Sequence, residues 1–136
     1  MTVVVDASVV VRWFVAQPGH AKAAGWLERF VSEPELLVAP DLLRFEVFGA
    51  LCRLQSPSDP GWVMRCFDRF ERLGMRTLPT TLALFQRASE MSRELRIGGY
   101  DAVYLALAEG LGIPWLTADE KALRRLRKDR RVLALG

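Results

Sequence analysis

Histidine is nearly absent from this chain, because His20 is the only one among its 136 residues. A zinc site built on several histidines is therefore excluded, and a Ser-His-Asp catalytic triad is disfavoured. His20 follows a Gln-Pro-Gly turn, which is typical of a helix cap or a solvated loop residue. Cysteine is scarce as well: Cys52 and Cys66 lie among apolar neighbours in helical patterns, which predicts buried free thiols in a reducing cytosol.

Long apolar runs are also missing. No stretch approaches the roughly 20 apolar residues of a membrane span, and no basic segment precedes an apolar run at the N-terminus, as in a secretion signal. The chain has no Gly-rich phosphate loop and no dinucleotide fingerprint. The sequence thus predicts a cytoplasmic protein with no membrane partner, and its length predicts a single domain over residues 1–136.

The charge balance is modestly basic, with a net charge of +3 that already includes 16 acidic residues. If several of those acids are pooled in one site, the remaining surface is more basic than the net charge suggests. Such a surface suits a polyanionic partner such as a nucleic acid.

Four acidic residues stand at the edge of apolar segments or inside them. They are Asp6, Glu46, Asp101 and Asp119. A buried carboxylate is costly unless it is paired or bound to metal, and clustered carboxylates repel one another unless a cation neutralises them. Oxygen-only ligation suits a hard divalent ion, which here means Mg²⁺ or Mn²⁺.

Apolar, β-branched runs alternate with segments of helical periodicity along the whole chain. Strands are predicted at residues 2–5, 36–39, 75–78, 113–117 and 132–135. Helices are predicted at residues 8–16, 21–32, 40–54, 62–73 and 82–95, from residue 101 to the glycines at 110 and 112, and at 119–128. Strands that alternate with helices indicate a parallel α/β sheet with helices on both faces.

The order of these elements suggests where the four acids lie. Asp6 follows the first predicted strand and Asp119 follows the fourth. Ligands of such sheets bind outside the carboxyl ends of the strands, at the point where the strand order reverses. If the two strands are neighbours there, the two acids meet. Asp101 begins a predicted helix and Glu46 lies about a turn and a half into another, so both can reach the same edge.

Each acid also has a simpler interpretation. Asp6, Asp101 and Asp119 could each cap the helix that follows. Glu46 is harder to explain in this way, because its neighbours one turn away on either side are apolar. Asp41 follows a proline at a predicted helix start and is interpreted as a cap outside the site.

Further polar residues lie close to these acids in the sequence. Ser8 comes two residues after Asp6, and Thr117 comes two before Asp119. Their hydroxyls could hold the carboxylates or a metal-bound water, or could serve only in turns. Arg12, Lys121 and Arg124 are candidates for RNA phosphate contacts, with a solvated helix face as the alternative.

The sequence resembles a known family at four places in order. They are residues 5–14 (VDASVVVRWF), 40–47 (PDLLRFEV), 100–108 (YDAVYLALA) and 116–121 (LTADEK). These segments are similar to the four motifs of PIN-domain ribonucleases, in particular the VapC toxins of toxin–antitoxin pairs. Each motif is weak alone, and the four in register are a strong signal.

The resemblance implies a three-layer α/β/α fold with a parallel sheet of four or five strands. It implies a homodimer or larger assembly, and cleavage of single-stranded or looped RNA to a 5′-phosphate and a 3′-hydroxyl. It also implies an antitoxin partner whose C-terminal segment would block the active site. In this family the four acids would be catalytic and would hold Mg²⁺ or Mn²⁺.

Other classes of protein remain open. A phosphoacceptor receiver domain needs an acidic pair after its first strand, which Asp6 lacks. The main rival is a non-catalytic RNA- or partner-binding PIN-like module whose acids hold a structural metal. A DNA-directed flap nuclease is the enzymatic rival, and the short chain and the missing helical clamp segment argue against it.

Overall fold

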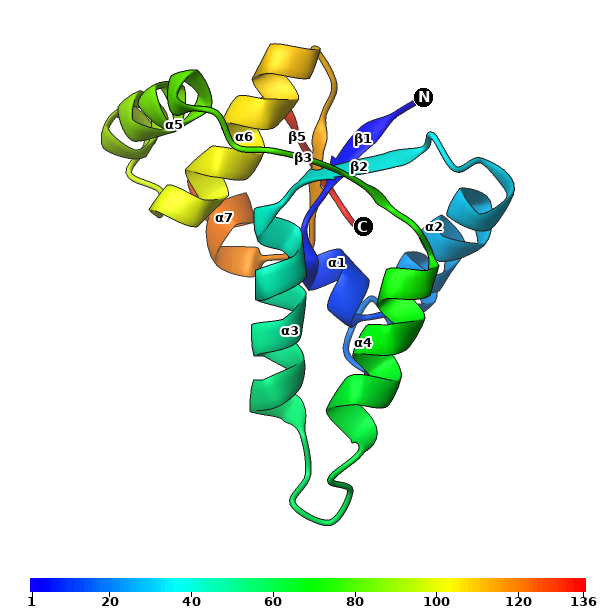
Figure 1. Ribbon diagram of the computed structural model, residues 1–136. Helices are drawn as coiled ribbons and strands as arrows, with labels where there is room; N and C mark the ends of the chain where they lie inside the picture. The colour runs from blue at the N-terminus through cyan, green and yellow to red at the C-terminus, as the bar shows by residue number, and fades with distance from the viewer.

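The computed structural model describes all 136 residues, which form five strands and seven helices (Figure 1). The strands are β1 (Val3–Val5), β2 (Leu37–Pro40), β3 (Arg76–Leu78), β4 (Trp115–Thr117) and β5 (Val132–Ala134). The helices are α1 (Ala7–Val11), α2 (His20–Ser32), α3 (Leu42–Leu54), α4 (Trp62–Arg72), α5 (Leu82–Leu95), α6 (Gly99–Leu111) and α7 (Glu120–Arg125). None of the helices is both long enough and apolar enough to cross a bilayer.

All five strands are parallel and lie in the order β3-β2-β1-β4-β5. The order reverses between β1 and β4, so the first and fourth strands are neighbours at the switch point, as the site prediction required. Val5 pairs with Leu116 in the register of these two strands. The backbone N–H of Asp6 continues the ladder by donating to the carbonyl of Leu116 at 2.9 Å.

The sheet separates two apolar cores, which gives the three-layer α/β/α architecture. Val3 and Val5 pack into one core with residues of α1, α2, α3 and α4. Val4, which points to the opposite face, packs with residues of α5, α6 and α7. Figure 1 shows these two groups of helices on opposite sides of the sheet. Because helices cover both faces, β1 is a continuous apolar run with every residue fully buried.

The start of α6 differs from the sequence prediction and changes the position of one acid. The sequence placed the first residue of this helix at Asp101, but the helix begins at Gly99. Gly98 is the N-cap in an extended conformation, and its carbonyl accepts from the Ala102 N–H at 3.0 Å to close the first turn. Asp101 is therefore a first-turn residue and not the cap.

Two helices are shorter than their periodicity predicts. The predicted helix at residues 8–16 ends at Val11 and continues as turns, where the Trp13 indole donates to the Ala23 carbonyl at 2.9 Å. The predicted helix at 119–128 ends at Arg125, because Leu126 leaves the helical conformation at φ −111° and ψ 26°. Leu126 is still buried there, in the core that includes residues of α5 and α6.

Smaller differences concern individual residues. Pro40 ends strand β2, although the sequence placed it at the start of the next helix. His20 is the exposed first residue of α2, with Gly19 as its cap in the left-handed region at φ 91°. Cys66 is buried and Cys52 partly buried, and both thiols are free, as predicted. The remaining element boundaries move by one or two residues, which is the ordinary scatter of helix and strand ends.

Candidate active site

Asp6 lies at the carboxyl end of β1 and is only 6% exposed. Its side chain caps α1, because Oδ2 accepts from the backbone N–H of Ser8 at 3.1 Å. The simple capping interpretation of this residue is therefore correct, but it does not exclude a second role. A carboxylate with two oxygens and several lone pairs can cap a helix and still face a ligand.

Two hydroxyls connect the ends of β1 and β4 around Asp6. Thr117 Oγ1 donates to Asp6 Oδ2 at 3.2 Å, and it lies 3.3 Å from Ser8 Oγ. Ser8 Oγ also accepts from the backbone N–H of Ala118 at 2.9 Å. The network holds the Asp6 carboxylate from the start of α1 and from the end of β4.

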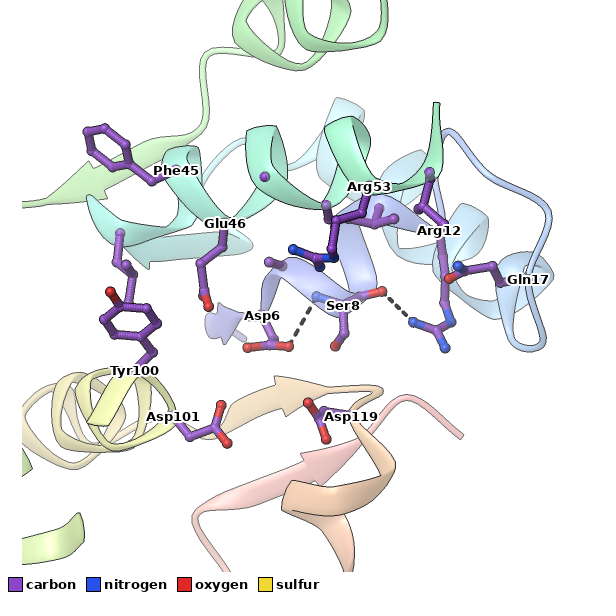
Figure 2. A pocket seen from close by; sticks show the side chains of 16 residues that line it. Asp6, Ser8, Arg12, Gln17, Phe45, Glu46, Arg53, Tyr100, Asp101 and Asp119 are labelled. Atoms are coloured by element: carbon purple, nitrogen blue, oxygen red, sulfur yellow. Dashed lines mark hydrogen bonds between the residues drawn. The ribbon is translucent and has the colours of Figure 1, made fainter. Parts of the chain in front are cut away.

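The other three acids enter from different elements. Glu46 projects from the second turn of α3, and Asp101 from the first turn of α6. Asp119 is the N-cap of α7, where its Oδ1 accepts from the Ala122 N–H at 3.0 Å. All four acids line one pocket of about 630 Å³, and Figure 2 shows their carboxylates directed toward its centre.

The pocket disfavours negative charge unless something neutralises it. Burial raises the pKa of Glu46 to about 7, with repulsion from Asp6 and Asp101 adding to the effect. Burial likewise raises the pKa of Asp101 to about 6, with Asp6 and Asp119 adding to it and Lys121 opposing it. Burial also raises the pKa of Asp6, against the hydrogen bonds from Ser8 and Thr117. Such coupled carboxyl groups occur at functional sites more often than elsewhere.

The walls of the pocket differ at its two ends. Arg12 lines it beyond Ser8, and Arg53 projects from α3 between Glu46 and Arg12 (Figure 2). Tyr100 lies beside Asp101, and Phe45 lies next to Glu46 with its ring directed away from the carboxylates. The side chains of Phe45 and Tyr100 are 72% and 66% exposed, respectively. Arginine side chains and exposed aromatic rings beside a cluster of acids are suited to the backbone and bases of a single-stranded nucleic acid.

Comparison with known proteins identifies the family. The sequence matches the PIN domain family over residues 3–129. The chain belongs to the PIN-domain family. No curated protein matches the sequence.

Two solved structures are similar to this PIN domain over nearly its whole length. One is described as a toxin–antitoxin complex from Klebsiella pneumoniae, with a TM-score of 0.74, 14% identity, and 99% of this chain and 98% of that chain covered. The other is PAE2754 from Pyrobaculum aerophilum, with a TM-score of 0.73, 21% identity, and coverage of 99% and 90%, respectively. At such low identity the likeness extends to the fold alone.

The donor set of this PIN domain fits a hard divalent cation by its chemistry. It consists of carboxylate oxygens, which Mg²⁺ and Mn²⁺ favour. As the side chains lie, no group of three acids is placed to share one ion. Asp6 and Asp119 are fixed by their capping bonds, whereas Glu46 and Asp101 accept no hydrogen bond of standard geometry. Those two carboxylates are therefore not fixed by capping bonds as the other two are.

The predicted RNA-binding residues have different positions in the PIN domain. Arg12 lines the pocket and is held in place by donating to the carbonyls of Ser8 at 2.7 Å and Pro18 at 2.8 Å. Lys121 is exposed in α7 and acts on Asp101 only through its charge. Arg124 is exposed and does not line the pocket.

Sequence reasoning missed the pocket-lining Phe45 and Tyr100, which directly precede Glu46 and Asp101 in the sequence, and two further residues of the site. Arg53 lies two turns after Glu46 on α3, a spacing that places both on one helix face. Tyr104 lies three residues after Asp101 inside a wholly buried stretch of α6, where it resembles an ordinary core residue. The helical spacing from a known acid was the available signal in both cases.

The Ser8 hydroxyl offers a direct test of the connection between the two strand ends. We expect Ser8→Ala to lower the free energy of unfolding by about 1–3 kcal/mol, because the Ala118 N–H loses its acceptor. Urea denaturation in EDTA measures this loss. Ser89→Ala, at an exposed position of α5, is the matched control. Equal stability of the two variants would show that the Ser8 network does not stabilise the fold.

Proposed function

We propose that this PIN domain is a Mg²⁺- or Mn²⁺-dependent endoribonuclease that acts in the cytoplasm as the toxin of a toxin–antitoxin pair. PIN domains are generally nucleases, which supports the reaction class. The single observation that supports this reaction best is the convergence of Asp6, Glu46, Asp101 and Asp119 on one pocket at the switch point of the sheet. A similar fold occurs in a toxin–antitoxin complex, which supports an antitoxin partner. A homodimer or larger assembly belongs to the same proposal.

The proposed reaction is hydrolysis of an RNA phosphodiester bond. When bound, a divalent ion would supply a water of lowered pKa and would neutralise charge on the phosphate. Asp6 at the end of β1 and Asp119 at the end of β4 would hold the ion together with Glu46 and Asp101. Ser8 and Thr117 keep the Asp6 carboxylate in place through their hydroxyls.

The walls of the pocket bind the substrate in this proposal. Arg12 and Arg53 contact backbone phosphates on one side of the acids. Phe45 and Tyr100 offer exposed rings on which unpaired bases stack on the other side.

The test is cleavage of labelled single-stranded and stem-loop RNAs by the purified chain, freed of any copurified partner. We expect products in Mg²⁺ or Mn²⁺ and none in EDTA. RNA or partner binding without turnover, in either metal and over several RNAs, would favour the non-catalytic module with a structural metal. Cleavage of branched DNA in preference to RNA would favour the flap-nuclease class.

Arg53 provides the most direct test of the phosphate contacts, because its side chain is exposed and makes no hydrogen bond or salt bridge. Arg12, by contrast, also donates a hydrogen bond to the backbone carbonyl of Ser8. We expect Arg53→Gln to weaken RNA binding in EDTA and to reduce the slope of log K against log salt by about 0.7. Fluorescence anisotropy at several salt concentrations measures the slope. Arg93→Gln, an exposed change in the last turn of α5, is the control with the same loss of charge. If the slope of log K against log salt were identical for both variants, Arg53 would not contact the RNA phosphates.

A further inference from the structure

The hydroxyl of Tyr104 has no hydrogen-bond partner although the side chain is completely buried. The ring stacks on Trp115 of β4, with centroids 5.9 Å apart and planes 14° from parallel. Phenylalanine would make the same stacking contact, so packing does not account for the hydroxyl. A buried donor without an acceptor costs free energy, and a native structure that keeps one calls for an explanation.

The surroundings of this hydroxyl point to the acid site. Tyr104 lies one turn after Asp101 on α6, and its hydroxyl faces Glu46, Asp6 and the backbone of Ala7. A phenolic hydroxyl is protonated at neutral pH, so Tyr104 has a hydrogen to donate.

Glu46 lacks a donor, unlike the two acids at the strand ends. Asp6 accepts from the Ser8 N–H and from the Thr117 hydroxyl. Asp119 accepts from the Ala122 N–H. Glu46 has no bond of this kind from backbone or side chain, and the Tyr104 hydroxyl lies near it without hydrogen-bond geometry.

We propose that Tyr104 positions Glu46 in the carboxylate site by donating its hydroxyl to the Glu46 carboxylate when that side chain turns toward a divalent ion. The inference rests on the proposed function, because it requires that the site bind such an ion. Residues that form hydrogen bonds to metal ligands commonly contribute 10–100-fold to metal affinity. Tyr104 is thus a positioning residue that contacts neither RNA nor metal.

The experiment compares Tyr104→Phe with the wild-type chain by Mn²⁺ titration, followed by electron paramagnetic resonance of the free ion, at pH 8 and without RNA. We expect at least about tenfold weaker Mn²⁺ binding in the variant. In EDTA the melting temperature should be unchanged or higher, because the variant loses an unpartnered buried hydroxyl. Ser89→Ala removes a hydroxyl from an exposed position of α5 outside the pocket and should leave the Mn²⁺ affinity unchanged.

A double-mutant cycle separates this role from a general packing effect. Once Glu46→Ala has removed the acceptor, Tyr104→Phe should cause no further loss of Mn²⁺ affinity. An undiminished Mn²⁺ affinity in Tyr104→Phe, or an equal loss in the Glu46→Ala background, would overturn the inference while leaving the proposed function intact. A wild-type chain that binds no Mn²⁺ would instead overturn the proposed function, and the inference with it.

Discussion

Replacing Asp6 with asparagine is expected to abolish metal-dependent RNA cleavage and to leave the metal-free protein equally stable or more stable. Asparagine keeps the shape of the side chain and an oxygen that can cap α1. It removes the buried negative charge, which burial already disfavours by raising the pKa of Asp6. Activity and stability therefore move in different directions, which is typical of a residue kept for function rather than for folding.

The size of the loss follows from the role proposed for Asp6. Even groups that only support metal ligands contribute 10–100-fold to activity, so loss of a direct ligand should reduce the cleavage rate more than about 100-fold. Single-turnover cleavage of a labelled RNA in Mn²⁺ measures the rate, and thermal unfolding in EDTA measures the stability.

A matched control is available on the same edge of the sheet. Asp41 lies at the N-cap position of α3, as the sequence predicted, but its carboxylate makes no capping bond and accepts from Thr80 Oγ1 at 2.8 Å. It is exposed and does not line the pocket. Asp41→Asn should therefore cleave RNA at the wild-type rate. If Asp6→Asn did so too, Asp6 would not be part of the catalytic site.

The metal-free protein is expected to lose stability as the pH rises from about 4 to 7. Glu46 and Asp101 have pKa values of about 7 and about 6 in the fold, against ordinary values of 4.5 and 3.8. Over this range the folded chain holds protons that the unfolded chain has released, so the free energy of unfolding falls as the pH rises. Above the folded pKa of Glu46 these two groups cause no further loss. Thermal unfolding in EDTA at half-unit pH steps measures the effect.

Metal binding should show the opposite dependence on pH. Mn²⁺ competes with protons for Glu46 and Asp101, so its apparent affinity should rise as the pH passes through 6 and 7. The rise is at most about tenfold per pH unit for each displaced proton.

Glu46→Gln removes one titrating group and should flatten the dependence of the stability of the metal-free protein on pH. A wild-type stability that is level between pH 4 and 7 would contradict the assigned burial of the two acids.

The sequence by itself determined the class of fold, because burial on both faces of a sheet leaves a local signature. Val3, Val4 and Val5 form a continuous apolar run because helices cover both sides of β1, and runs of this kind are typical of parallel α/β sheets. The positions of Asp6 and Asp119 directly after two strands were equally visible. Both signals depend only on neighbours along the chain.

Only the tertiary structure decided that β1 and β4 are adjacent, since strand order results from contacts between residues far apart in sequence. The same holds for helix ends: Leu126 is apolar and fits a helical pattern, but its backbone leaves the helical conformation and α7 ends before it. Tyr104 is the strongest case. The role inferred for its hydroxyl depends on Glu46, which α3 places near α6. Whether a buried polar group has a hydrogen-bond partner depends on the residues that surround it in the fold and not on its position in the sequence.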